Sequence, residues 1–189
     1  PVLRILSLLV FLFSGLARAS DQVVDAEHDR LSDEMERLAE RKIWTGVERK
    51  YDELAALGIE MTRDDYLIGA HAARELGDVM DAYVRLKVAA RIKGTKEIVD
   101  WLWDIDNNYG HVALVAVPSR SSVLTADDVP FDPNQRNAVE AAIKRAKQDG
   151  RFEGMLPKGA YNFSGQRFEV VPGISVKIEV SPRMRRQGM

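Results

Sequence analysis

The chain has 189 residues, contains no cysteine, and carries 27 lysines and arginines against 29 acidic residues. This length allows one or two domains with a real core. An apolar content of 46% with 30% charged residues excludes a polytopic membrane protein and a wholly disordered chain. Without cysteine there are no disulfides, thiol catalysis or cysteine-ligated metals. The net charge of −2 gives no electrostatic signature of nucleic-acid binding.

Residues 1–19 have the pattern of a secretory signal peptide. Arg4 precedes the apolar run Ile5–Leu16, and the small-residue site Ala17-Arg18-Ala19 follows. A positive start, a short apolar stretch and an A-x-A site are typical of an exported protein that is cleaved after Ala19. The alternative is a retained N-terminal anchor. We therefore expect a periplasmic or secreted protein that has no membrane anchor after cleavage.

Helical periodicity extends from Asp29 to Asn108. Gly46 marks the expected bend of a first helical hairpin, and Gly77-Asp78 marks that of a second, whose first helix Thr62 is expected to cap. Shifting the sequence by 35 residues superposes the apolar positions of the two hairpins. The superposed pairs are Leu31 with Tyr66, Met35 with Ala70, Leu38 with Ala73, Val47 with Ala82, Tyr51 with Leu86 and Leu54 with Ala89.

The second hairpin resembles a tetratricopeptide repeat. The resemblance rests on small and bulky residues at the packing positions of that motif: Ala70, Gly77-Asp78, Ala82, Leu86 and Ala89. It covers residues 29–94, with a degenerate first unit. It implies stacked helical hairpins whose concave face binds another protein. A generic helical bundle is the alternative.

A further helix is predicted over Thr95–Asn108. Its apolar stripe consists of Ile98, Trp101, Leu102, Ile105 and Tyr109. Trp103 points away from this stripe, because successive helical residues are about 100° apart. Two interpretations of Trp103 remain open: it packs between the helical part and the C-terminal third of the chain, or it is an exposed anchor for a partner.

The C-terminal third changes period. The apolar run His111–Val117 predicts a strand buried on both faces, and the polar segment Ser119–Val129 predicts a connection. A helix is expected over residues 134–148, capped by Asp132 and stopped by Gly150. Alternation with period two then predicts three strands, the last two as a hairpin, at Tyr161–Phe163, Phe168–Val170 and Ile174–Val180. The strand and the helix are candidates to cover their apolar face.

The lead-in Leu156-Pro157-Lys158-Gly159-Ala160-Tyr161, together with these strands, resembles the small PEGA-type β modules of bacterial envelope proteins. That resemblance implies a β-sandwich-like module without chemistry. Together the patterns predict an α+β chain in four parts. These are a signal peptide over 1–19, a tetratricopeptide-like helical domain over 20–109, a small antiparallel β module over 110–181 with an inserted helix over 134–148, and a disordered basic tail over 182–189.

The sequence offers few residues for chemistry. Asp104–Gly110 places acidic and amide oxygens at alternate positions, as calcium loops do, but Val115 stands where a bidentate glutamate is needed. The histidines His28, His71 and His111 form no zinc-binding pair. We therefore expect no catalytic residue, no metal ligand and no cofactor.

The predicted function is a non-enzymatic exported adaptor that binds an unknown envelope protein through its helical hairpins. The alternative is an envelope glycan-binding module, with Trp103, Tyr109 and Tyr161 as candidate stacking residues. An enzyme is a third hypothesis, which would need a cleft of convergent polar groups.

Overall fold

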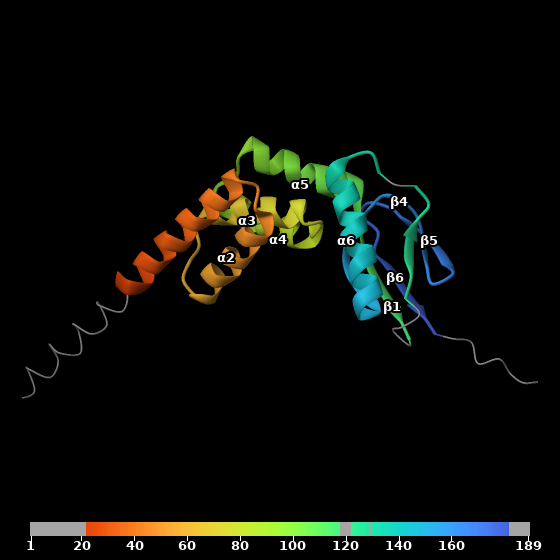
Figure 1. The fold of residues 1–189 in the computed structure, drawn as a ribbon. Helices are drawn as coiled ribbons and strands as arrows, with labels where there is room; N and C mark the ends of the chain where they lie inside the picture. Colours follow the sequence, from red (N-terminus) through yellow and green to blue (C-terminus); the bar gives the residue numbers. More distant parts are fainter. Residues whose placement is uncertain (1–21, 118–121, 129, 182–189) are drawn as a thin grey trace, which may run out of the picture. The chain divides into compact units, whose positions relative to one another are not determined.

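The computed structural model describes residues 22–117, 122–128 and 130–181 (Figure 1). The chain divides into two compact units, residues 1–61 and 62–189. In the described residues, helices precede the first strand, and small sheets with one inserted helix come after it, so the predicted α+β class is confirmed. The predicted signal peptide and basic tail lie outside the described residues. Of the helices that are described, none is long and apolar enough to cross a membrane.

The first unit contains one helical hairpin. A helix over residues 22–40 is joined to α2 (Trp44–Ala56) by a turn in which Lys42 has a φ of 56°. The predicted bend at Gly46 is wrong, because Gly46 lies inside α2. A Cβ at this position would come within 3.2 Å of the Leu38 side chain. Gly46 therefore lets the two helices approach each other closely rather than turning the chain.

Three helices open the second unit: α3 (Arg63–Glu75), α4 (Val79–Lys93) and α5 (Lys96–Asn108). Each begins at a residue whose side chain accepts a hydrogen bond from the first turn. Thr62 caps α3 in a capping box with Asp65, as the sequence predicts for Thr62. Asp78 and Thr95 cap α4 and α5. The bend between α3 and α4 falls at Gly77, as predicted, with a φ of 81°.

The inserted helix α6 (Pro133–Asp149) also agrees with its sequence signals. The Asp132 side chain accepts a hydrogen bond from the Gln135 amide at the start of the helix. Gly150 ends it in the left-handed conformation, with a φ of 71°. No further loop separates the helix from the sheet, because β3 begins at Arg151.

The bend between α3 and α4 rests directly on α6. A Cβ on Gly77 would lie 2.3 Å from the carbonyl oxygen of Asn137, so only glycine fits. The side-chain amide of Asn137 donates to the backbone carbonyl of Glu75 at 3.0 Å, and Arg145 pairs with Asp78 at 2.6 Å. Helices α3 and α4 therefore belong to the same compact unit as the strands, as the division of the chain also indicates.

The strands that the structure describes form two three-stranded sheets. One sheet has the order β3-β1-β6 and consists of β3 (Arg151–Pro157), β1 (Tyr109–Ala116) and β6 (Val176–Val180). The other has the order β2-β4-β5 and consists of β2 (Leu124–Ala126), β4 (Gly159–Phe163) and β5 (Gln166–Val170). β1 is antiparallel to β3 but parallel to β6, so the first sheet is mixed.

This pairing corrects the predicted antiparallel β module. The expected hairpin of the last two strands is wrong, because β5 pairs with β4 while β6 crosses to the other sheet beside β1. β2 also occupies part of the segment expected to be a connection. Near the crossing, a Cβ on Gly110 would meet the Val170 side chain and the Val171 carbonyl oxygen, both at 2.8 Å. Alternation defines the apolar face of a strand but not its neighbour, so it does not predict the pairing.

Two hydrophobic clusters fill the second unit. The first joins both sheets and α6, and includes Leu114, Leu156, Ile178, Phe163, Val170, Val139 and Ala142. The second joins α3, α4 and α5 to the start of β1 and to α6, and includes Ala70, Leu86, Ala89, Ile98, Ile105, Tyr109 and Ala138. The helices and the sheets therefore share contacts through Tyr109 and Ala138 rather than through a flexible linker.

Candidate functional site

Helix α5 presents an exposed apolar pair to solvent. Trp103 is 66% exposed, and Val99, one turn earlier, is 57% exposed. The opposite side of the helix buries Ile98 and Ile105, so the stripe predicted from the sequence faces inward. The exposure of Trp103 excludes the interpretation that it packs between the helical part and the β module. We call Trp103 and Val99 the α5 surface.

The helix beneath this surface is anchored by the neighbouring tryptophan. Trp101 meets His71 edge to face, with the ring centroids 4.2 Å apart. The guanidinium of Arg74 lies 5.3 Å from the Trp101 ring centroid and pairs with Asp104 at 2.9 Å. Because His71 and Arg74 belong to α3, these contacts hold α5 against α3 and give Trp103 a fixed support.

Burial also affects the titration of His71. Desolvation lowers the pKa of His71, and the nearby charge of Arg74 lowers it further, while Glu97 and Glu75 act in the opposite direction. The neutral imidazole is therefore favoured beside the Trp101 ring. A neutral ring can lie against the indole without adding a second positive charge next to Arg74.

Helix α5 itself is acidic. The helix carries one basic residue, Lys96, and four acidic residues: Glu97, Asp100, Asp104 and Asp106. Lys96 pairs with Asp100 at 2.5 Å. A hydrogen bond with Asp106 raises the pKa of Tyr83. The helix that carries the exposed indole thus has a net negative charge.

Tyr109 and Tyr161, the other two candidate binding residues, are both 2% exposed and lie in the core. Tyr109 belongs to the cluster around α3, α4 and α5, whereas Tyr161 belongs to the cluster between the sheets. Tyr161 donates a hydrogen bond to the carbonyl of Pro157 at 2.9 Å and stacks on Phe168. Burial raises the pKa of both tyrosines well above the usual range. The structure does not bring either ring to the surface beside Trp103.

The calcium-like segment Asp104–Gly110 is divided between α5 and β1. Asp104 accepts hydrogen bonds from Arg74 and from Asn108, so its carboxylate is engaged within the fold. Gly110 meets Val170 closely, which accounts for the glycine. Within the described ranges, no three His, Asp or Glu side chains are grouped so that they could hold a metal ion.

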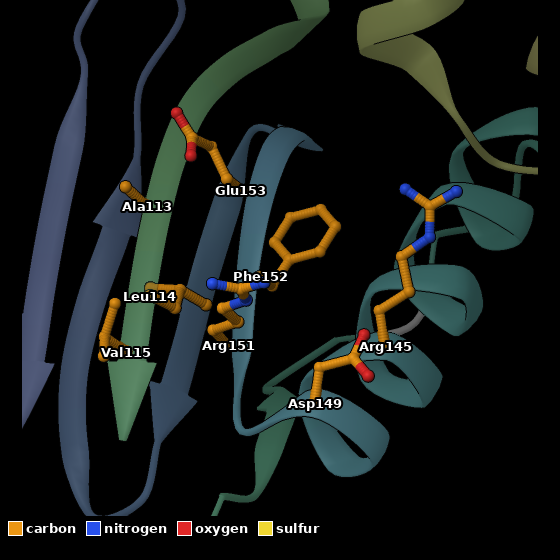
Figure 2. A pocket seen from close by; sticks show the side chains of 8 residues that line it. All are labelled: Ala113, Leu114, Val115, Arg145, Asp149, Arg151, Phe152 and Glu153. Carbon is orange, nitrogen blue, oxygen red and sulfur yellow. The ribbon is translucent and has the colours of Figure 1, made fainter. Parts of the chain in front are cut away.

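A shallow pocket of about 470 Å³ lies between α6 and the sheet. Figure 2 shows Arg145 and Asp149 reaching from α6, while Arg151, Phe152 and Glu153 come from β3. The two arginines and the two acidic residues balance each other in charge. Arg145 is also paired with Asp78, so the pocket has no excess of free positive charge to select an anion.

Sequence reasoning did not single out the charged residues on this side of the sheet. Arg151 and Glu153 lie on β3, where no strand was predicted. The alternation in the last strand does place Lys177 and Glu179 on a polar face, but only the pairing with β1 shows what lies beside them.

Compared with protein-family models, with curated proteins and with solved structures, the chain shows no match to any of them.

Proposed function

We propose that this protein is a non-enzymatic adaptor, exported to the cell envelope, that binds another protein through its helical part. The observation that carries the proposal is the exposure of Trp103, at 66%, beside Val99 on α5. Tryptophan is among the residues most enriched at the energetic centres of protein interfaces. An indole held on a fixed helix loses little conformational entropy when a partner covers it.

The packing of α3 and α4 supports the further proposal that these helices are a tetratricopeptide-like hairpin. Ala70 of α3 and Leu86 and Ala89 of α4 occupy motif packing positions and share one cluster. Ile98 and Ile105 of α5 join the same cluster. In repeat proteins a hairpin buries its apolar face against the next element, and here α5 supplies that element.

The net negative charge of α5 favours a protein partner with a defined chemistry. We expect an apolar cavity for Trp103, bordered by lysine or arginine side chains that face Asp100 and Asp106. A glycan partner has less support, because stacking on a sugar requires an accessible ring face and Tyr109 and Tyr161 are buried. Of the three candidate residues, Trp103 alone is exposed.

Site-specific photocrosslinking in the producing cells tests this proposal. A photoreactive phenylalanine analogue at position 103 should give one crosslinked species of defined mass, whereas the same analogue at the exposed Lys144 of α6 should not. Excess unlabelled protein should compete the crosslink away, and excess Trp103→Ala should compete poorly. Equal crosslinking from the two positions would contradict the proposal.

A further inference from the structure

The sheet β3-β1-β6 has one face whose side chains are exposed or partly exposed around the second half of β1. On β1, Val112 and Leu114 point into the core, whereas Ala113 and Val115 point outward and are partly exposed. Val117, which continues the pairing with β6 through a hydrogen bond to Val180, is 51% exposed. The middle of this open face is therefore a strip of small apolar side chains.

Four exposed charged side chains border the strip, two on each outer strand: Arg151, Glu153, Lys177 and Glu179. The strand register arranges them in two rows. Val115 lies opposite Arg151 on β3 and opposite Glu179 on β6. Ala113 lies opposite Glu153 and Lys177 in the same way. Each row therefore has a positive and a negative end, and the sign reverses from one row to the next.

None of these four charges is used inside the described part of the fold. Among the described residues, no ion pair within 4.0 Å joins any of them to another side chain. Figure 2 shows Arg151 and Glu153 on β3 beside Ala113 and Val115 on β1; with Arg145 and Asp149 of α6, they also line the shallow pocket described above. Their exposure leaves the four side chains free to meet charges outside the molecule.

A face with this alternating pattern is complementary to itself. If a second copy is laid face to face and turned about a two-fold axis perpendicular to the strands, Arg151 meets Glu153 of the copy. By the same operation Lys177 meets Glu179 of the copy, and Val115 meets Ala113. All four charges then face an opposite charge, and the apolar strips cover each other, as an isologous interface requires.

A two-fold axis along the strands would also pair opposite charges, Arg151 with Glu179 and Glu153 with Lys177 of the copy. The position of the helices distinguishes the two arrangements. At the start of β1, Tyr109 points to the same side as Ala113 and is covered by side chains of α4 and α5. An axis along the strands would bring these helices of the two copies to the same end of the interface. The perpendicular axis places them at opposite ends. We propose that the open face of the β3-β1-β6 sheet pairs with the same face of a second copy in this antiparallel arrangement.

The size of the face sets the strength of the contact. Three strands about 4.8 Å apart, each with about five residues, cover only a few hundred Å² per copy, less than the roughly 800 Å² of a standard interface. The dimer is therefore weak and depends on ionic strength, since its four ion pairs are at the rim. The proposal does not use the α5 surface and is independent of the function proposed above.

Sedimentation equilibrium of the purified protein, from about 10 μM to about 1 mM in low salt, tests the pairing. Wild-type protein should associate reversibly to a dimer, and about 0.5 M salt should weaken it. Arg151→Glu turns two symmetry-related attractions into repulsions and should raise the dissociation constant roughly tenfold or more. The matched control Lys144→Glu makes the same charge change on α6 and should leave association unchanged.

The double variant Arg151→Glu/Glu153→Arg restores opposite charges across the perpendicular axis, so its dimer should recover to within about threefold of wild type. Across an axis along the strands, the same double variant would place Glu beside Glu179 and Arg beside Lys177. Failure to recover would overturn the antiparallel arrangement. A protein that stays monomeric at about 1 mM in low salt would overturn the pairing itself, as would equal weakening by Arg151→Glu and Lys144→Glu. Circular dichroism verifies that each variant is folded.

Discussion

The contact between the α3–α4 bend and α6 gives the sharpest test of the fold, through two glycines that differ in one respect. Gly77 and Gly173 have nearly the same left-handed backbone, with φ of 81° and 76°. A Cβ on Gly77 would lie 2.3 Å from the carbonyl oxygen of Asn137 and 2.8 Å from the Cβ of Ala141. A Cβ on Gly173 would meet nothing within 4 Å. Replacing each glycine by alanine therefore separates backbone strain from close packing.

The two substitutions share one cost and differ in another. An L-residue in the left-handed region costs about 1–2 kcal/mol, which applies equally to Gly77→Ala and Gly173→Ala. The entropy that alanine removes from the unfolded chain is also equal and cancels. Overpacking adds about 1–3 kcal/mol for Gly77→Ala alone, because the atom that is struck is backbone and cannot rotate away. We therefore expect Gly77→Ala to lose about 1–3 kcal/mol more stability than Gly173→Ala, whose own loss is at most about 1–2 kcal/mol.

Urea unfolding followed by far-ultraviolet circular dichroism measures both losses on the whole protein. The linear extrapolation compares the midpoints, provided that the slope with denaturant is unchanged. A Gly77→Ala variant that is no less stable than Gly173→Ala would refute the close contact between the bend and α6. It would also remove one of the reasons for treating α3, α4 and the strands as one compact unit.

Three further predictions concern the two tryptophans Trp101 and Trp103, the titration of His71, and the N-terminus of the exported protein. Trp103→Ala should change the free energy of unfolding by less than about 0.5 kcal/mol, whereas Trp101→Ala should cost roughly 2 kcal/mol because its ring contacts with α3 are lost; urea titrations compare the two. Because the pKa of His71 is lowered, the unfolded chain binds the proton first, so stability is complete above about pH 6.5 and declines slightly as the pH falls through the lowered value. His71→Gln should flatten this decline in thermal melts at several pH values, and an unchanged slope would contradict it. Protein recovered from the periplasm should begin at Ser20 by mass spectrometry, and a mass that retains residues 1–19 would contradict cleavage after Ala19.

The helical elements could be predicted from the sequence because their signals are local. Thr62, Asp132 and Gly150 lie within one turn of the helix ends that they define. Gly46 misled the prediction because a glycine signals either a bend or a close approach, and only the neighbouring helix distinguishes them. The sequence did not predict β3 because Gly154 interrupts the alternation of this strand. The glycine is needed there because a Cβ would come within 2.9 Å of the Phe152 ring.

The strand pairing could not be predicted because it depends on residues that are distant in the chain. β6 lies beside β1, more than sixty residues earlier, and is parallel to it. A crossover of this kind has no local turn signal, unlike the tight turn at Ser164 and Gly165 that joins β4 to β5. Alternation correctly placed Lys177 and Glu179 on a polar face. Alternation did not indicate that Arg151 and Glu153 lie on the same face, where they complete the pattern of alternating charges with Lys177 and Glu179.

The difference between local signals and long-range contacts also explains why Trp101 packs against α3 while Trp103 is exposed. Helical phase places them on different sides of α5, and that much can be derived from the sequence. Whether a side is covered depends on other elements: α3 covers Trp101 with His71 and Arg74, and no described element covers Trp103. Whether a face is exposed thus depends on how the elements of the unit pack together. The α5 surface and the open face of the β3-β1-β6 sheet are each exposed because of different neighbouring elements. Trp103→Ala should leave the sheet dimer intact, and Arg151→Glu should leave crosslinking at position 103 intact. Loss of both contacts in either variant would mean that the two surfaces are parts of one interface.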